Sequence, residues 1–237
     1  MKKLYQEIVD AKANNKKLLA ILIDPDKVAL SEVAIITAKI NRSPATHIFL
    51  GGSTVETTSL DALVELLKQQ TALPIILFPG NPSQIAPAAD GILFLSLISG
   101  RNADYLIEHQ VNAVPLLRAT NLEIIPTGYI LIESGSETAV ARVSKTTPLS
   151  RSNHEYVLQT AQAGVMLGKK LIYLEAGSGA KIPVPLEMIS LVSNSIAIPL
   201  IVGGGIKGLN EIQNAYKAGA DLVVIGNAFE ENLDFFN

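Results

Sequence analysis

The sequence predicts an α/β fold in which residues 1–237 form a single TIM (β/α)₈ barrel domain. Three observations predict it. Short apolar runs recur at fairly even spacing, amphipathic stretches lie between most of them, and no Pro/Gly-rich linker divides the chain. A length of 237 residues gives each of eight strand–helix units about 30 residues, close to what this barrel needs.

The candidate strands are apolar runs that are continuous rather than alternating, which is typical of parallel strands covered on both faces. They are Leu18–Ile23, His47–Leu50, Pro74–Phe78, Gly91–Leu95, Gly128–Ile132, Leu171–Leu174, Pro199–Val202 and Leu222–Ile225. Helical periodicity is clearest in three stretches between them, where apolar residues recur three and four positions apart: Ser59–Gln70, Asn153–Leu167 and Leu209–Ala218.

Three connections are irregular. The segment NPSQIAPAAD between the third and fourth runs contains Pro82 and Pro87, which leave no room for a full helix, so we expect a loop or a single turn there. The C-terminal FEENLDFFN allows at most a stub of the eighth helix. The longest connection, Ser134–Ser152, is polar and glycine-containing, and we expect it as a loop on the functional rim.

Composition excludes several classes of function. With 19 Lys+Arg against 22 Asp+Glu, the chain has no basic excess for nucleic acid. The absence of cysteine excludes disulfides, thiolate catalysis and zinc–sulfur sites, and we expect the three scattered histidines, His47, His109 and His154, to be structural. The N-terminus has no apolar signal-peptide core, and every apolar run is far shorter than the ~20 residues of a membrane span, so we expect a cytoplasmic protein.

Glycine-rich loops after the seventh and eighth strands indicate a phosphate site. In such barrels the active site forms at the carboxyl ends of the strands, and phosphate is often held by the last two loops. Here these loops read Gly203-Gly204-Gly205-Ile206-Lys207 and Gly226-Asn227. Glycines let backbone N–H groups approach phosphate oxygens, although tight turns with positive φ favour the same residues.

The loop after the first strand, DPDK, carries two carboxylates, Asp24 and Asp26. A carboxylate at the end of a strand can hold Mg²⁺, which prefers oxygen ligands and often shares them with a phosphate. Ser53 or Thr54, after the second strand, could add a neighbouring ligand. Each of these residues could instead cap a helix, and the residues alone leave both interpretations open.

The sixth strand is followed by Glu175 and a flexible glycine-containing loop. An acidic residue at the top of a strand beside such a loop is a candidate general base. The alternative is a structural carboxylate that pairs with a cation of the barrel.

Together these loops resemble those of the geranylgeranylglyceryl phosphate synthase family, which includes the bacterial PcrB-type heptaprenylglyceryl phosphate synthases. The segment FLSLISGRNADYLI is similar to the archaeal and Bacteroidetes-type branch. Barrels of this family lack the third helix, in agreement with the proline-containing gap. The matching segments run from the first strand to the eighth and are Ile23–Lys27, Gly51–Ser53, Gly128–Ile130, Tyr173–Glu175, Gly203–Lys207 and Val224–Ala228.

The resemblance implies a Mg²⁺-dependent prenyltransferase. It would join sn-glycerol 1-phosphate to geranylgeranyl diphosphate, or another polyprenyl diphosphate, through an ether bond and release diphosphate. Asp24 and Ser53 would bind the metal, and Tyr173 and Glu175 would be catalytic, with Glu175 removing the proton. The residues implied to contact glycerol phosphate are Tyr173, Leu174, Glu175, Ala176, Gly177, Ser178, Gly179, Gly204, Gly205, Gly226 and Asn227.

The prenyl tail requires an apolar groove, which we expect near Leu95, Ile98 and the Pro79–Pro82 loop, where the third helix is missing. The loop AGSGAKIPVP lacks the bulky aromatic residues of the PcrB-type enzymes, which favours geranylgeranyl over heptaprenyl diphosphate. The resemblance also implies a homo-oligomer, either a dimer or a hexamer. A lipid product is compatible with transient contact at a membrane surface, although no basic amphipathic helix is visible.

Two other functions compete with this interpretation. One is another phosphate-binding TIM-barrel enzyme, such as a phosphosugar isomerase, an aldolase or a thiamin-phosphate-synthase-like protein. A Schiff-base aldolase needs an inward lysine on a strand, whereas Lys27 and Lys207 lie in loops. The other is a barrel that only binds a phosphorylated ligand, which would need neither Asp24 nor Glu175.

Overall fold

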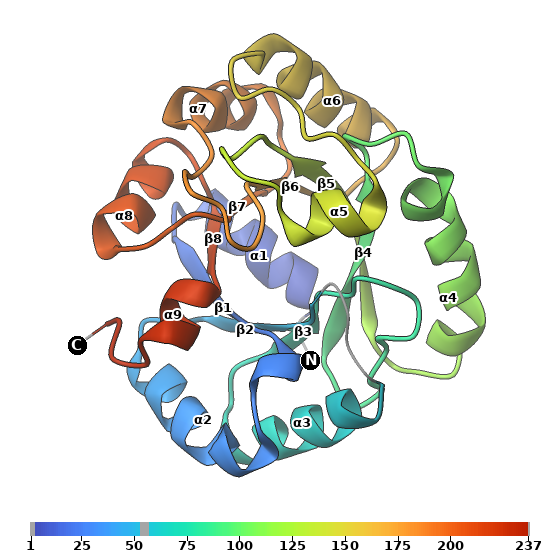
Figure 1. Cartoon of the computed structure of the whole chain (residues 1–237), viewed down its shortest axis with the longest axis vertical. Helices are drawn as coiled ribbons and strands as arrows, with labels where there is room; N and C mark the ends of the chain where they lie inside the picture. The colour runs from blue at the N-terminus through green and yellow to red at the C-terminus, as the bar shows by residue number, and fades with distance from the viewer. Residues whose placement is uncertain (1–2, 53–56, 237) are drawn as a thin grey trace.

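Eight parallel strands close into a barrel in chain order, which confirms the predicted fold (Figure 1). The computed structural model describes residues 3–52 and 57–236. Ile21 of the first strand lies opposite Ile48 of the second and Ile225 of the last, so the ring is complete. The strands are β1 (Leu18–Ile23), β2 (His47–Leu50), β3 (Ile75–Leu77), β4 (Gly91–Leu97), β5 (Glu123–Leu131), β6 (Leu171–Glu175), β7 (Leu200–Gly203) and β8 (Leu222–Ile225).

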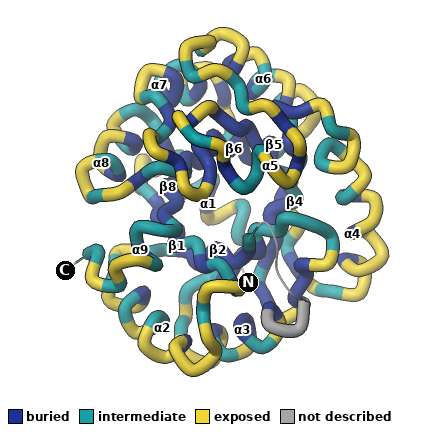
Figure 2. The backbone as a smooth tube through the Cα atoms, viewed as in Figure 1, coloured by how far each residue is buried: buried dark blue, intermediate teal, exposed yellow. Residues whose placement is uncertain are grey.

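Two hydrophobic clusters follow from the alternation of side chains along each strand. One fills the barrel interior and includes Phe49, Leu93 and Tyr173, all fully buried. The other lies between the strands and the surrounding helices and includes Ile48 and Leu174. Figure 2 shows the strands as buried, with the exposed residues on the outer faces of the helices and in the loops.

The helices form an outer ring around the strands (Figure 1). In α3 (Thr57–Gln70), four apolar side chains are buried at the spacing from which the sequence predicts a helix: Leu60, Leu63, Val64 and Leu67. The α-helices are α1 (Leu4–Ala13), α2 (Val33–Arg42), α3 (Thr57–Gln70), α4 (His109–Leu117), α5 (Ala139–Ser144), α6 (His154–Met166), α7 (Leu186–Ser195), α8 (Leu209–Lys217) and α9 (Asn227–Glu231). Short 3₁₀ turns occupy Pro25–Lys27 and Leu30–Glu32, and a π-helical turn at Asp104–Glu108 leads into α4.

The connection from β3 to β4 contains no helix, as its two prolines predict. Side chains hold it as a compact loop instead. The amide oxygen of Gln84 accepts the Gly80 N–H at 2.9 Å, and Asp90 accepts the Ile75 N–H at 2.8 Å and the Lys68 ammonium at 2.6 Å. The ring of helices is therefore interrupted between α3 and α4, and the five-residue α9 confirms the expected C-terminal stub.

Two elements differ from the sequence-based prediction. β5 begins at Glu123, five residues before the predicted start at Gly128, because this segment pairs with the first half of β4. The connection 134–152, predicted as a loop, contains the short helix α5. Its N-terminus is capped by Thr138, whose hydroxyl oxygen accepts the Ala141 N–H at 3.3 Å.

Helix α1, which the sequence analysis does not assign, closes the N-terminal end of the barrel. Its Ile8 and Ala11 join the interior cluster, and the N–H groups of Leu4 and Tyr5 donate to the carboxylate of Glu123. Figure 1 shows α1 behind the strands, opposite the loops that face the viewer. The amino ends of the strands are therefore covered, while the carboxyl ends face the loops. None of the helices in the described ranges is long and apolar enough to cross a membrane.

Candidate active site

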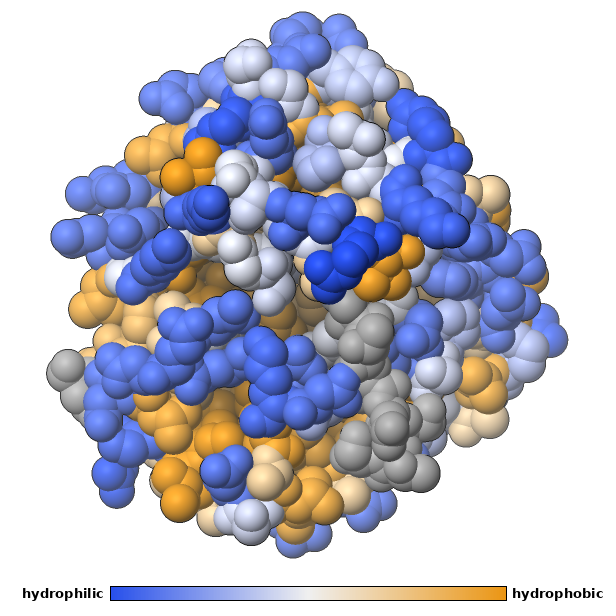
Figure 3. Space-filling view, viewed as in Figure 1, coloured by the Kyte–Doolittle hydropathy of each residue, from blue (hydrophilic) through white to orange (hydrophobic). Residues whose placement is uncertain are grey.

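A cavity of about 860 Å³ opens at the carboxyl ends of the strands. Its polar end is bordered by the loops after β1, β6, β7 and β8, and its apolar end by β4, α4 and the loop after β3. In Figure 3, apolar surface is visible in a hollow near the middle of the molecule, surrounded by hydrophilic side chains. The cavity can therefore take a ligand with one charged end and one apolar end.

Aromatic rings form the floor of the cavity. The rings of Tyr173 and Tyr129 meet edge to face with centroids 5.2 Å apart, and that of Phe78 lies 5.6 Å from Tyr173. Burial, together with the nearby Glu175 carboxylate, raises the pKa of both tyrosines well above the ordinary value, so both stay neutral. The Tyr173 hydroxyl is buried beside the Glu175 carboxylate, whose pKa it lowers, and it makes no hydrogen bond of ordinary geometry among the described residues.

Glu175 is the last residue of β6 and is 6% exposed. Its Oε1 accepts the Gly177 N–H at 2.7 Å. Burial raises the pKa of Glu175 to about 7, against smaller lowering effects of the Tyr173 hydroxyl and the Gly177 N–H. A carboxylate that titrates near neutrality can accept a proton from a substrate hydroxyl at physiological pH.

Glycines after β7 make a backbone concavity beside Glu175. Gly204 and Gly205 have φ of +80° and +70°, so neither position tolerates a side chain without strain. A Cβ on Gly204 would also lie 2.3 Å from Glu175 Oε1 and 2.5 Å from the Gly177 nitrogen. Successive backbone N–H groups in a turn of this kind can bind an anion such as phosphate.

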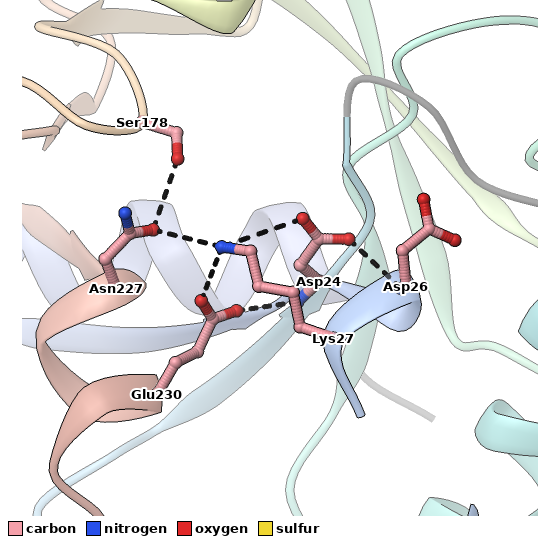
Figure 4. A network of polar contacts seen from close by, with 6 residues as sticks. All are labelled: Asp24, Asp26, Lys27, Ser178, Asn227 and Glu230. Atoms are coloured by element: carbon pink, nitrogen blue, oxygen red, sulfur yellow. Dashed lines mark hydrogen bonds and ion pairs between the residues drawn. The ribbon is translucent and has the colours of Figure 1, made fainter. Parts of the chain in front are cut away.

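The loops after β6 and β8 meet at the rim of this concavity (Figure 4). The Ser178 hydroxyl donates to Asn227 Oδ1 at 3.2 Å, and Gly226 lies beside Asn227 on the cavity wall. Lys27 reaches the same amide oxygen from the loop after β1, at 3.5 Å. Polar groups of three separate loops therefore converge here.

Asp24 directly follows β1, and Figure 4 shows its carboxylate beside Lys27. Its Oδ1 accepts the Asp26 N–H at 3.2 Å, so it caps the turn Pro25–Lys27, which the sequence left as one of two alternatives. Its Oδ2 lies 3.8 Å from the Lys27 ammonium. Burial raises the pKa of Asp24, although the Asp26 N–H and Lys27 oppose this effect.

Space for a cation exists beside this carboxylate. A Cβ on Gly52 would lie only 2.7 Å from Asp24 Oδ1, so glycine keeps the approach to the carboxylate open. Within residues 3–52 and 57–236, no three His, Asp or Glu side chains are arranged so that together they could hold a metal ion, so the protein supplies few ligands. Ser53, the second predicted metal ligand, lies outside the described residues, as does Thr54.

The structure brings most of the predicted site residues together. The residues of the predicted set that line the cavity are Asp24, Tyr173, Glu175, Gly177, Ser178, Gly179, Gly204, Gly205, Gly226 and Asn227. The side chains of Leu174 and Ala176 do not line it, because they pack in the outer cluster behind the strands. Only the backbone of these two residues is placed to contact a ligand, and their predicted contact with glycerol phosphate stays a prediction.

The apolar end extends between β4 and α4, beside the interrupted part of the helix ring. Leu95 and the loop Pro79–Pro82 line it, as predicted, together with Phe94 and Ala113. Ile98 does not, because its side chain packs toward Gly128 and Gly164 on the other side of the strand layer.

The histidines occupy different environments. His47 is buried in the first position of β2, and burial, with Lys16 nearby, lowers its pKa to about 4. His154 begins α6 and bonds the Arg151 carbonyl through Nε2 at 3.0 Å. His109, expected to be structural, borders the cavity with its ring 4.6 Å from that of Tyr105.

Sequence reasoning missed Glu230, a cavity-lining residue of α9 that contacts the loop after β1. The closed order of the strands is the signal that could have found it. Because β8 pairs with β1, the segments that follow these two strands must lie side by side.

Comparison with known proteins gives consistent matches along the chain. The sequence profile of the PcrB family matches residues 12–236. The chain is 65% identical over 234 residues to the geranylgeranylglyceryl phosphate synthase of Flavobacterium johnsoniae, which covers 99% of this chain and 96% of that protein. It is 38% identical over 226 residues to the protein of the same name from Pyrococcus furiosus, with coverage of 95% and 89%.

Solved structures agree. The crystal structure of (S)-3-O-geranylgeranylglyceryl phosphate synthase from Thermoplasma acidophilum in complex with substrate sn-glycerol-1-phosphate matches with a TM-score of 0.93 at 32% identity, over 100% of this chain and 95% of that chain. Thiamine phosphate pyrophosphorylase from Pyrococcus furiosus matches with a TM-score of 0.56 at 17% identity, over 92% of this chain and 89% of that chain. The second match shows the shared fold alone.

Proposed function

The chain belongs to the PcrB family, and we propose on this premise that its cavity joins sn-glycerol 1-phosphate to geranylgeranyl diphosphate. This is the reaction of a prenyltransferase, the class to which the named relatives belong. The observation that carries the proposal is the position of Glu175. This buried carboxylate, with a pKa near 7, lies between a glycine concavity and an apolar extension of the same cavity.

In the proposed reaction the free primary hydroxyl of sn-glycerol 1-phosphate attacks C1 of the prenyl diphosphate. The bond between C1 and the diphosphate oxygen breaks, and its electron pair leaves with diphosphate. The new ether oxygen loses its proton to the carboxylate of Glu175. Because Glu175 Oε1 is already bonded to the Gly177 N–H, Oε2 is the oxygen available to accept the proton.

Glycerol phosphate would be held at both ends. The phosphate would lie in the concavity of Gly204 and Gly205, closed by Ser178 and Asn227. The Tyr173 hydroxyl, which lies buried beside Glu175, would bind a glycerol hydroxyl. These contacts place the attacking oxygen beside Glu175, and the low exposure of that carboxylate keeps bulk water away from it.

Magnesium fits the loop after β1. A single carboxylate with open space in front of it is the type of protein ligand that Mg²⁺ uses when it shares a phosphate. Asp24 would hold the ion, and Ser53 is the second ligand that we propose. When bound, Mg²⁺ would neutralise the charge of the diphosphate and make it a better leaving group.

The apolar extension would take the prenyl tail. It lies where the helix between β3 and β4 is absent, and its wall consists of residues such as Leu95, Phe94 and Ala113. A tail in this position points away from the phosphate concavity, so the charged and apolar parts of the two substrates do not compete for the same surface. We propose geranylgeranyl diphosphate as the favoured length.

Homo-oligomerisation, as a dimer or a hexamer, is also part of the proposal. The outward face of the segment around α4 is apolar, with Ile107, Val111 and Leu116 each about half exposed in a single chain. Exposed apolar faces of this kind are commonly covered by a second subunit. Sedimentation or light scattering measures the state directly, and a monomer at micromolar concentration contradicts this part.

Product formation tests the proposed function. Purified protein is incubated with sn-glycerol 1-phosphate, Mg²⁺ and prenyl diphosphates of several lengths, and the ether-linked product is identified by mass spectrometry. We expect product and released diphosphate in equal amounts. Absence of product with every chain length refutes the proposal and leaves another phosphate-binding barrel enzyme as the alternative.

A further inference from the structure

Glu230 uses its two carboxylate oxygens on two different donors of the loop after β1 (Figure 4). Oε1 accepts the backbone N–H of Asp24 at 3.1 Å, and Oε2 accepts the Lys27 ammonium at 2.8 Å. The Glu230 side chain is 15% exposed, against 46% for Lys27. One side chain of the C-terminal stub therefore fixes both the backbone and the Lys27 ammonium of the DPDK turn.

The position of Glu230 is rigid because of the fold around it. The pairing of β8 with β1 brings α9 against the turn that follows β1. Phe229, the preceding residue, is 2% exposed, and its ring packs 6.3 Å from that of Phe236. The helix is thus anchored by its apolar side, while Glu230 faces the cavity.

Lys27 has two carboxylates within reach. Its ammonium is 2.8 Å from Glu230 but 3.8 Å from Asp24 Oδ2, so the closer contact is with Glu230. If Glu230 lost its charge, it would no longer draw the Lys27 ammonium away from Asp24. Lys27 would then approach Asp24 and occupy the space that Gly52 leaves open beside that carboxylate.

We propose that Glu230 is a positioning residue for prenyl transfer. It anchors the DPDK turn and holds Lys27 away from Asp24, which keeps the Asp24 carboxylate available for a divalent cation. The proposal rests on the proposed function, because it takes Asp24 as the residue that holds the cation. It assigns a role to a residue of the C-terminal stub that takes no part in the proposed bond changes.

The test measures cation binding by the full-length protein, apart from turnover. Mn²⁺ serves as the probe with inorganic diphosphate present, and the signal of free Mn²⁺ in electron paramagnetic resonance reports its dissociation constant. Glu230→Gln removes the charge that attracts Lys27 and keeps an oxygen for the Asp24 N–H. Glu230→Ala removes both contacts. Substitution of a residue that orients a metal ligand typically lowers metal affinity about 10- to 100-fold.

We expect Glu230→Gln to weaken Mn²⁺ binding about 10-fold and Glu230→Ala to weaken it further. The double variant Glu230→Gln with Lys27→Met should recover much of the loss, because no ammonium remains to compete for Asp24. A residue with a purely structural role would show no such recovery. Circular dichroism and thermal unfolding confirm that each variant is folded.

Asp234→Asn is the matched control. Asp234 lies in the same C-terminal segment and pairs with Lys39 of α2, and its side chain does not line the cavity, so its loss should leave Mn²⁺ binding unchanged. The proposal is overturned if Glu230→Gln binds Mn²⁺ like the wild type, if Asp234→Asn loses as much, or if the double variant shows no recovery.

Failure of the proposed function gives a different pattern. If Asp24→Asn binds Mn²⁺ like the wild type, the cation is not held by Asp24, and both the metal assignment and this inference fail. If the wild type makes no ether product although Mn²⁺ binding responds to Glu230 as expected, the proposed reaction fails and only the effect of Glu230 on cation binding at Asp24 stands.

Discussion

Replacing Glu175 with glutamine should strongly reduce turnover and stabilise the folded protein at the same time. Glutamine has nearly the same shape and keeps an oxygen for the Gly177 N–H, but it cannot accept a proton. Loss of a general base typically costs about 100- to 10,000-fold in rate. Binding of sn-glycerol 1-phosphate should change little, because the groups proposed to hold the phosphate, the backbone of Gly204 and Gly205 and the side chains of Ser178 and Asn227, are all retained.

The gain in stability follows from the raised pKa. Burial moves the pKa of Glu175 from 4.5 to about 7 in the folded chain. The folded state therefore holds a proton that the unfolded state releases between these two values, so stability falls as the pH rises from 4.5 to 7. At 1.36 kcal/mol for each pH unit, ionised Glu175 costs the fold about 3 kcal/mol above pH 7.

Urea unfolding at pH 5 and at pH 8.5 measures this cost. The glutamine variant should resemble the wild type at pH 5 and exceed its free energy of unfolding by about 3 kcal/mol at pH 8.5. Wild-type kcat/KM should rise with pH through about pH 7, where the carboxylate loses its proton. Equal stability differences at both pH values refute the electrostatic argument. Equal losses of turnover and of glycerol phosphate binding, measured by calorimetry, make Glu175 a binding residue instead.

Three further predictions follow from other parts of the structure. Gly204→Ala should weaken sn-glycerol 1-phosphate binding more than 10-fold in calorimetry, because its Cβ meets Glu175 Oε1 at 2.3 Å; unchanged affinity places the phosphate elsewhere. His47→Leu should reduce acid sensitivity, because a histidine pKa lowered from 6.5 to about 4 costs about 3 kcal/mol as the pH falls between those values. Parallel acid-unfolding curves for variant and wild type contradict this. Ala113→Phe should shift activity toward shorter prenyl diphosphates, whereas an unchanged length profile moves the tail away from α4.

The barrel could be predicted from the sequence because most strands are continuous apolar runs. The missing helix between β3 and β4 could also be predicted, because proline restricts the backbone locally. The early start of β5 was missed because the segment from Glu123 contains a charge and a proline and pairs only through its neighbour β4. Helix α1 was missed because its apolar residues are few and their partners lie at the far end of the barrel.

The candidate site was predictable where one residue type is needed at one place, as at Gly204 and Glu175. It was less predictable where the direction of a side chain decides whether a residue reaches the cavity. Strand alternation turns Leu174 away from the cavity while its neighbours face it, and a motif does not contain that information. The contact of Glu230 with Lys27 joins residues 203 positions apart, so only the closed strand order could have indicated it.

Because α1 closes one end of the barrel, the cavity is not a channel through the barrel; it opens at the other end and extends sideways beside β4. Among the described residues, the cavity that contains Glu175 reaches from the rim at the strand ends to the apolar side beside β4. If the substrates bind as we propose, a small polar molecule enters and leaves at the rim while a long apolar chain stays bound beside β4. The exchange of one reactant then does not require the release of the other.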